Sequence, residues 1–173
     1  DAEKFSRYFD GAPIVEVPGR MYPVEVVWDE ENYYGKEVVV AAVELSIVIH
    51  DHRPVGDILI FMTGVDDISA VVEQLEAHKR DDLVVLPAHG SLSTDDQARI
   101  FQNFPGKRKV IVATNIAETS ITIEGVVYVI DSGLVKQTNF DSQTGIQSLD
   151  VVAHSQAGCD QRAGRAGRTQ PGI

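Results

Sequence analysis

The chain has 173 residues, of which 43% are hydrophobic and 24% charged, a composition typical of one globular domain with its own core. Its formal net charge of −11 excludes a generally basic nucleic-acid-binding surface, so any contact with phosphates must be made locally by a few placed groups. The single cysteine, Cys159, excludes an internal disulfide, and no apolar run is long enough to cross a membrane. We therefore expect an intracellular protein.

The first third of the chain carries mixed signals. Residues 1–23 hold three prolines and few periodic apolar positions, which is typical of a connecting segment. The run Val24–Trp28 is a strand candidate. Between Tyr34 and Ile49 apolar residues recur at helical spacing, although the valine content favours a strand. Because about fifteen residues is long for a strand, we predict a helix there.

The rest of the chain alternates short apolar runs with helical patterns. Strands are predicted at Ile58–Met62, Leu83–Leu86, Val110–Ala113 and Val126–Ile130. Ile68–Leu75 has one apolar helical face, and a capping-box pattern of Thr94 with Gln97 opens a helix that continues to Phe104. Leu134–Val152 is predicted to form a β-hairpin. Strands alternating with helices imply a parallel sheet covered on both faces.

A final helix is predicted to carry Gln161–Arg168, in which three arginines recur every third residue and are separated only by alanine and glycine. On a helix this spacing would place the arginines along one drifting face. A glycine inside a helix costs roughly 1 kcal/mol relative to alanine, so the small spacers indicate that another surface approaches closely. Guanidinium groups are planar and suit bidentate contact with phosphate oxygens. The alternative interpretation is a solvated basic helix or a targeting patch.

A second polar stretch, Ala113–Ile123, directly follows a predicted buried strand. Ligands of open α/β sheets bind beyond the carboxyl ends of strands. Hydroxyl and amide side chains can contact phosphate and ribose there without adding net charge. This stretch and Gln161–Arg168 together resemble the fifth and sixth motifs of the DEAH-box RNA helicases, which belong to superfamily 2. Asp57–Gly64 is similar to the fourth motif, and Leu134–Val152 lies where this family inserts a hairpin that helps to separate strands.

The resemblance implies an α/β fold, a RecA-like three-layer sandwich with a mostly parallel sheet and an inserted β-hairpin. Residues 1–23 would form the end of a first RecA-like domain and the interdomain linker. Residues 24–173 would form the second RecA-like domain, truncated at its C-terminal end. We expect a piece of a longer protein, nuclear rather than cytoplasmic, whose first RecA-like and C-terminal helicase domains complete it. Its expected partners are RNA and an activator protein, without a membrane.

The resemblance also implies roles for single residues. Gln161 would position the attacking water, and Arg165 and Arg168 would be arginine fingers that reach the γ-phosphate. The nucleotide-binding residues would be Phe101, which would stack on adenine, Thr122, Glu124 and Arg162, the last either structural or beside a phosphate. The RNA-binding residues would be Thr63, Gly64, His89, Gly90, Thr114, Asn115, Thr119 and Lys136. An aromatic residue on an apolar helix face is usually part of the core, which is the alternative for Phe101.

The implied substrate is ATP or another NTP with Mg²⁺, whose ligands would lie mainly in the first domain, because this chain has no Gly-x4-Gly-Lys-Ser/Thr loop. No metal site is expected within the chain itself. The stretch His89–Ser93 departs from the family's usual Tyr-Ser-x-Leu-Pro, Glu124 replaces an aspartate, and Gln170 replaces a glycine. The function implied is the C-terminal half of an ATP-dependent RNA helicase, inactive as an isolated piece. The alternatives are a catalytically silent scaffold, or a DNA helicase or restriction subunit of the same superfamily.

Overall fold

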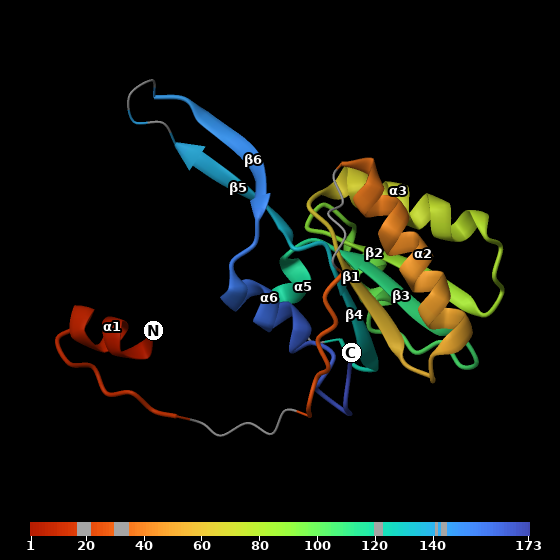
Figure 1. The fold of residues 1–173 in the computed structure, drawn as a ribbon, viewed down its shortest axis with the longest axis horizontal. Coiled ribbons are helices and arrows are strands. Elements are labelled where there is room, and N and C mark those ends of the chain that lie inside the picture. Colours follow the sequence, from red (N-terminus) through yellow and green to blue (C-terminus); the bar gives the residue numbers. More distant parts are fainter. Residues whose placement is uncertain (17–21, 30–34, 120–122, 141, 143–144) are drawn as a thin grey trace.

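The structure, a computed structural model, describes residues 1–16, 22–29, 35–119, 123–140, 142 and 145–173. Figure 1 shows a central sheet with helices on both faces and a hairpin that extends from one end. The four strands of the sheet are β1 (Asp57–Phe61), β2 (Leu83–Ala88), β3 (Arg108–Ala113) and β4 (Val126–Asp131). They are parallel and lie in the order β2-β3-β1-β4. All four predicted strands are confirmed to within two residues at each end.

Side-chain alternation along β1 divides the core into two layers. The helices are α1 (Ala2–Tyr8), α2 (Lys36–His52), α3 (Val65–Ala77), α4 (Thr94–Arg99), α5 (Ile116–Thr119) and α6 (Gln156–Ala163). Ile58 and Ile60 pack against the apolar faces of α2 and α3. Leu59 and Phe61 point to the other side of the sheet. There they pack with Ala117 of α5 and with Ile100, the residue that follows α4. Each fully buried aliphatic side chain contributes about 1.5–3 kcal/mol. The parallel sheet covered on both faces is therefore confirmed.

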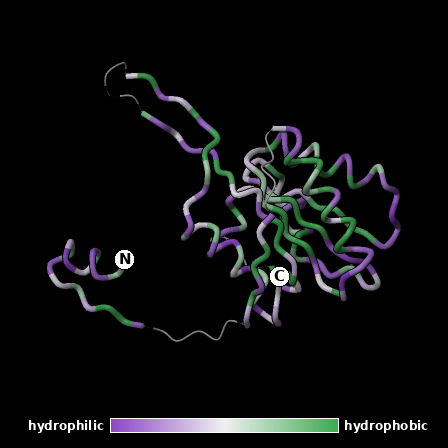
Figure 2. Tube along the Cα trace, in the orientation of Figure 1, coloured by the Kyte–Doolittle hydropathy of each residue, from purple (hydrophilic) through white to green (hydrophobic). Residues whose placement is uncertain are grey.

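The hairpin is a separate, two-stranded antiparallel sheet formed by β5 (Leu134–Phe140) and β6 (Gln147–Ala153). Figure 1 shows it extending away from the main sheet, and Figure 2 shows the most continuous hydrophobic stretches in the main sheet. Its apolar side chains Phe140, Leu149 and Val151 are each more than half exposed. Since two strands without a core are only marginally stable alone, the hairpin depends on the contacts at its base. None of the helices in the described ranges is long and apolar enough to span a membrane.

The prediction of a strand at Val24–Trp28 is wrong. Only Val24 forms a bridge, with Gly172, and Trp28 is 77% exposed. The edge of β4 is already paired, because the backbone N–H of Val129 donates to the carbonyl of Ile173 and the N–H of Ile173 donates to Val127. Gly172 and Ile173 thus lie between Val24 and β4, so Val24 is bridged to Gly172 and not to the sheet itself.

The helix after β2 begins and ends earlier than predicted. Its N-cap is Ser93, one residue before Thr94, and the Ser93 hydroxyl accepts from the N–H of Asp96 at 3.1 Å. The helix ends at Arg99, so the predicted continuation through Phe104 is wrong. The predicted helix of Tyr34–Ile49 is confirmed as α2, which buries Val39 and Val43 against the sheet.

Candidate functional site

The carboxyl ends of the four parallel strands lie in register along one edge of the sheet. Ala113 of β3 pairs with Ala88 of β2 and with Phe61 of β1, and Phe61 pairs in turn with Asp131 of β4. The predicted RNA-binding residues follow three of these ends, namely His89 and Gly90 after β2, Thr114 and Asn115 after β3, and Thr63 and Gly64 after β1. Side chains from three separate motifs therefore form one row at the edge where open α/β sheets bind ligands.

Lys136 of β5 adds a positive charge to this row. It lines a small cavity together with Thr63, Asn115 and Arg162. Its ammonium lies so close to Gly64 that a Cβ at that glycine would be 2.5 Å from the lysine Nζ. A cation, a hydroxyl and an amide are thus brought together, which is a set suited to phosphate oxygens. The Thr63 hydroxyl donates to Asp67, so it would have to turn away from that carboxylate before donating to a phosphate.

The three arginines do not share one helical face, and that prediction is wrong. Helix α6 ends at Ala163 with Gly164 as its C-cap, so Arg165 and Arg168 lie in the turns that follow. Glycine has a low helix propensity, and two glycines within four residues end the helix before the second arginine.

Gly167, the second glycine spacer, serves the packing of the chain itself. A Cβ at Gly167 would lie 2.6 Å from the carbonyl oxygen of Tyr22 and 2.7 Å from Cγ2 of Val24. The N–H of Tyr22 donates to the carbonyl of Gly167 at 2.8 Å. The close approach that the sequence indicates is therefore made by the segment before α2.

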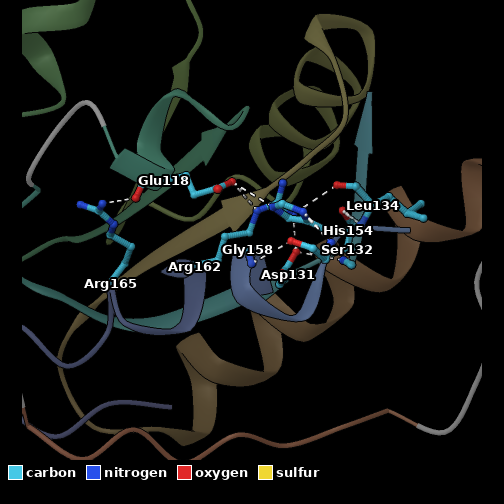
Figure 3. Close-up of polar contacts among 10 residues, drawn as sticks. Glu118, Asp131, Ser132, Leu134, His154, Gly158, Arg162 and Arg165 are labelled. Atoms are coloured by element: carbon cyan, nitrogen blue, oxygen red, sulfur yellow. Dashed lines mark hydrogen bonds and ion pairs between the residues drawn. The ribbon is translucent and has the colours of Figure 1, made fainter. Parts of the chain in front are cut away.

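Arg162 is the most buried of the three arginines, with 1% of its surface exposed. Its Nε donates to the carboxylate of Glu118 at 3.2 Å, and its Nη1 donates to Asp131 at 2.6 Å and to the carbonyl of Leu134 at 3.2 Å. The guanidinium also lies 4.9 Å from the centre of the Phe61 ring. Figure 3 shows these polar contacts converging on the guanidinium. This environment supports the structural interpretation of Arg162, and its nucleotide-binding role stays a prediction.

Glu118 of α5 joins this group to two further residues. Its carboxylate lies 3.1 Å from Nε2 of His154, and its backbone carbonyl accepts from the guanidinium of Arg165. The N–H of Ser155 donates to Nδ1 of His154 at 2.9 Å. Because Nδ1 accepts this bond, the proton of a neutral ring lies on Nε2 and is donated to Glu118.

The two predicted arginine fingers differ in exposure. Arg165 is nearly buried, with 9% of its surface exposed, whereas Arg168 lies on the surface. Gln161, the residue predicted to position the water, is also on the surface. Burial lowers the pKa of the Arg165 guanidinium, and the positive charge of Arg168 adds to this effect. An arginine remains protonated at neutral pH in spite of such a change. Arg165 and Arg168 are therefore two permanent cations that lie close enough to influence each other.

Phe101 lies just beyond α4 and is 56% exposed, which argues against the alternative that it belongs to the core. Phe101 and His89 line the same small cavity, so a predicted nucleotide-binding residue lies near a predicted RNA-binding residue. The buried ammonium of Lys109 donates to the carbonyls of Ile100 at 3.0 Å and Gln102 at 3.3 Å. These two carbonyls flank Phe101, so Lys109 fixes the backbone that presents the ring.

The remaining predicted site residues, Thr119, Thr122 and Glu124, lie in the chain between α5 and β4 or at the end of α5. Thr122 lies outside the described residues, and Thr119 is the last residue of α5. Glu124 is exposed in the turn before β4. Within the described ranges, no group of three His, Cys, Asp or Glu side chains is placed to hold a metal ion.

Sequence reasoning gave no role to Lys109, Glu118, Asp131 or His154. A weak signal was available for one carboxylate, because polar groups at the carboxyl end of a buried strand lie where ligands and charged partners gather. Asp131 directly follows the predicted strand Val126–Ile130, as such a partner would, whereas Glu118 lies within the polar stretch Ala113–Ile123. No comparable signal marks Lys109, whose ammonium contacts two backbone carbonyls and lies 3.6 Å from the carboxylate of Asp57, 52 residues earlier in the chain.

The parallel sheet with two helical layers, the polar row at its carboxyl edge and the inserted hairpin define a RecA-like α/β domain. The chain matches the helicase conserved C-terminal domain family over residues 39–170. Its whole length is similar to the crystal structure of Escherichia coli DEAH/RHA helicase HrpB, with 38% identity and a TM-score of 0.85, and covers 22% of that chain. It is also similar to the crystal structure of E. coli DExH-box NTPase HrpB, with 38% identity and a TM-score of 0.83, and covers 21% of that chain.

The chain belongs to the helicase C-terminal domain family and is the C-terminal RecA-like domain of a DEAH-type helicase. It spans about a fifth of the length of the solved structures that it matches.

Proposed function

We propose that this domain supplies arginine fingers and RNA-backbone contacts for NTP-driven RNA unwinding or ribonucleoprotein remodelling by a longer helicase. The observation that carries the proposal is the position of Arg165 and Arg168. They directly follow α6, and Arg165 is held by the backbone of α5, the helix that opens the polar stretch after β3. One fixed cation, Arg165, therefore adjoins the polar stretch beyond β3, and the exposed Arg168 lies close enough for its charge to act on Arg165.

Phosphoryl transfer to water needs a phosphate-cradling loop, Mg²⁺, a positioned water and cations that stabilise the developing charge. This domain would supply the last two. Gln161 is exposed on α6 and can orient a water, while Arg165 and Arg168 meet the transferred phosphoryl group when two domains close. A partly buried guanidinium stabilises such charge more strongly than a solvated one, because the local dielectric is lower. Bound Mg²⁺ would neutralise charge on the β- and γ-phosphates, with its ligands mainly in the other domain.

On the RNA side, the row at the carboxyl edge would hold the backbone. Its hydroxyls, amides and the Lys136 ammonium offer hydrogen bonds and one charge, which suit phosphate and sugar and carry no base readout. The net charge of −11 predicts weak RNA affinity for this domain alone. RNA would therefore be held through several domains of the longer protein.

We further propose that residues 1–23 end the first RecA-like domain and form the linker to residues 24–173. The first RecA-like domain would face the arginines across a cleft, and the C-terminal helicase domains would complete the RNA channel. The activator protein and the nuclear location stay predictions.

The experiment is NTP hydrolysis and duplex displacement by the full-length protein. We expect hydrolysis stimulated by single-stranded RNA and displacement that requires NTP. Arg165→Ala should abolish both while RNA binding changes by less than about threefold, roughly 0.6 kcal/mol. Arg53→Ala, which removes an exposed arginine beyond α2, is the matched control. RNA binding without hydrolysis by the unchanged protein would instead identify a silent scaffold.

A further inference from the structure

The first residue of β5 and the residue that follows β6 both contact one buried polar cluster, which consists of Glu118, His154 and Arg162. On the β5 side, Arg162 donates to the carbonyl of Leu134, the first residue of the strand. On the β6 side, His154 directly follows the strand, and its backbone N–H donates to the carbonyl of Gly133 at 2.7 Å. The ring of His154 then contacts Glu118, the residue that also holds Arg162. The orientation of the hairpin is thus fixed at its base by few contacts.

The ring of His154 occupies a space that the fold keeps for it. Only 13% of its side chain is exposed. A Cβ at Gly158 would lie 2.0 Å from Cε1 of the ring, so any larger residue at that position of α6 would displace the imidazole. Backbone and carboxylate together engage both ring nitrogens, which leaves the ring a single orientation. A residue that only filled space would not need this arrangement.

Glu118 connects the hairpin to a proposed arginine finger. Its carboxylate contacts His154 and Arg162, while its carbonyl accepts from Arg165. Figure 3 shows Arg165 on one side of Glu118 and the hairpin-base residues on the other. A rotation of the hairpin that moves His154 must either break its bond to Glu118 or shift α5, and a shift of α5 moves the carbonyl that holds Arg165.

We propose that His154 is a positioning residue which, through Glu118, couples the orientation of the hairpin to the placement of Arg165. RNA that loads the hairpin would then alter the rate of NTP hydrolysis through this contact. The inference rests on the proposed function, since it requires Arg165 to act on the nucleotide. It adds a set of contacts through which RNA binding at the hairpin changes the position of Arg165.

The test is the turnover number of the full-length protein, measured without RNA and with saturating single-stranded RNA. His154→Ala should leave the RNA-free turnover number within about twofold and reduce the stimulation by RNA about tenfold, as expected for one lost hydrogen bond to a charged group. His154→Gln should restore most of the stimulation, because its amide can donate to Glu118. The control is Asn139→Ala, which removes a 2.7 Å hydrogen bond to Asp150 farther along the hairpin and should leave the stimulation unchanged.

Equal losses with and without RNA in His154→Ala would show a merely structural role and overturn the proposal, as would unchanged stimulation. If the alanine variant unfolds, His154→Asn replaces it, because asparagine keeps the polarity and is too short to reach Glu118. Arg165→Ala in the same assay separates the two hypotheses. If it abolishes turnover while stimulation in His154→Ala stays normal, only the coupling fails. If it leaves turnover unchanged, the proposed function fails.

Discussion

Replacing Arg162 by methionine should destabilise the domain strongly. The change leaves the carboxylates of Glu118 and Asp131, which are 14% and 20% exposed, without their shared cation. Breaking a buried ion pair by removing one partner costs about 3–5 kcal/mol. Since both carboxylates retain some contact with solvent, we expect the low end, about 3 kcal/mol. For a domain of this size the loss corresponds to a decrease in Tm of about 6–12 °C.

Urea unfolding of the 173-residue chain measures this loss directly. The midpoint should fall without a change in m, because the surface exposed on unfolding is nearly unchanged. Glu118→Gln in the same background gives a double-mutant cycle, in which we expect a coupling energy of about 1–3 kcal/mol. Arg53→Met, at an exposed position, should stay within about 0.5 kcal/mol of the unchanged chain. Additive effects, or a loss from Arg162→Met no larger than that of Arg53→Met, would refute the assignment of Arg162 as the structural cation of this site.

Three further predictions concern the aromatic ring of Phe101, the carboxylate of Asp150 in the hairpin, and the base preference of RNA binding. Phe101→Ala in the full-length protein should weaken nucleotide binding by about 1–3 kcal/mol, and Lys109→Met should also weaken it. Fluorescence titration measures the nucleotide affinity, and no change in either variant would exclude base stacking on Phe101. Hydrogen bonds from Asn139 and Ser148 hold the pKa of Asp150 below its usual value, so its small stability contribution is present above the unfolded pKa of about 3.9 and is lost as pH falls through the folded pKa. Asn139→Ala should raise that pKa in an NMR titration, and an unchanged value would show that the bond is absent in solution. Exchanging the bases of a single-stranded RNA should change affinity by less than about threefold, roughly 0.6 kcal/mol, and a sharp preference would mean that the contacts reach base edges.

The main sheet could be predicted from sequence because its strands are short apolar runs buried on both faces. Ile58–Met62 and Val110–Ala113 show this pattern without interruption. The hairpin could be predicted because the sequence Gln143-Thr144-Gly145 stands at the middle of Leu134–Val152. Val24–Trp28 has the composition of a strand, but its pairing depends on Gly172 and Ile173 at the other end of the chain. Local sequence carries no information about partners that lie nearly 150 residues farther along the chain.

The candidate site could be predicted in part for a similar reason. The polar residues after β1, β2 and β3 lie at strand ends, and parallel strands bring their carboxyl ends to one edge. The environment of Arg162 could not be predicted, because its partners Asp131 and Glu118 are 31 and 44 residues away. The arginine spacing indicated one helical face, and the end of α6 at Ala163 separated the three arginines into different environments.

The most direct test of the arginine-finger proposal is the turnover number of Arg168→Ala in the full-length protein with RNA present, compared with its nucleotide Kd. Arginine fingers contribute about 10³–10⁵ in turnover, roughly 4–7 kcal/mol. We expect Arg168→Ala to lower the turnover number by orders of magnitude while the Kd changes far less, and Arg168→Lys not to restore it, since an ammonium lacks the fork geometry. Mild losses of turnover at both Arg165 and Arg168 would contradict the account, because neither guanidinium would then stabilise the transition state.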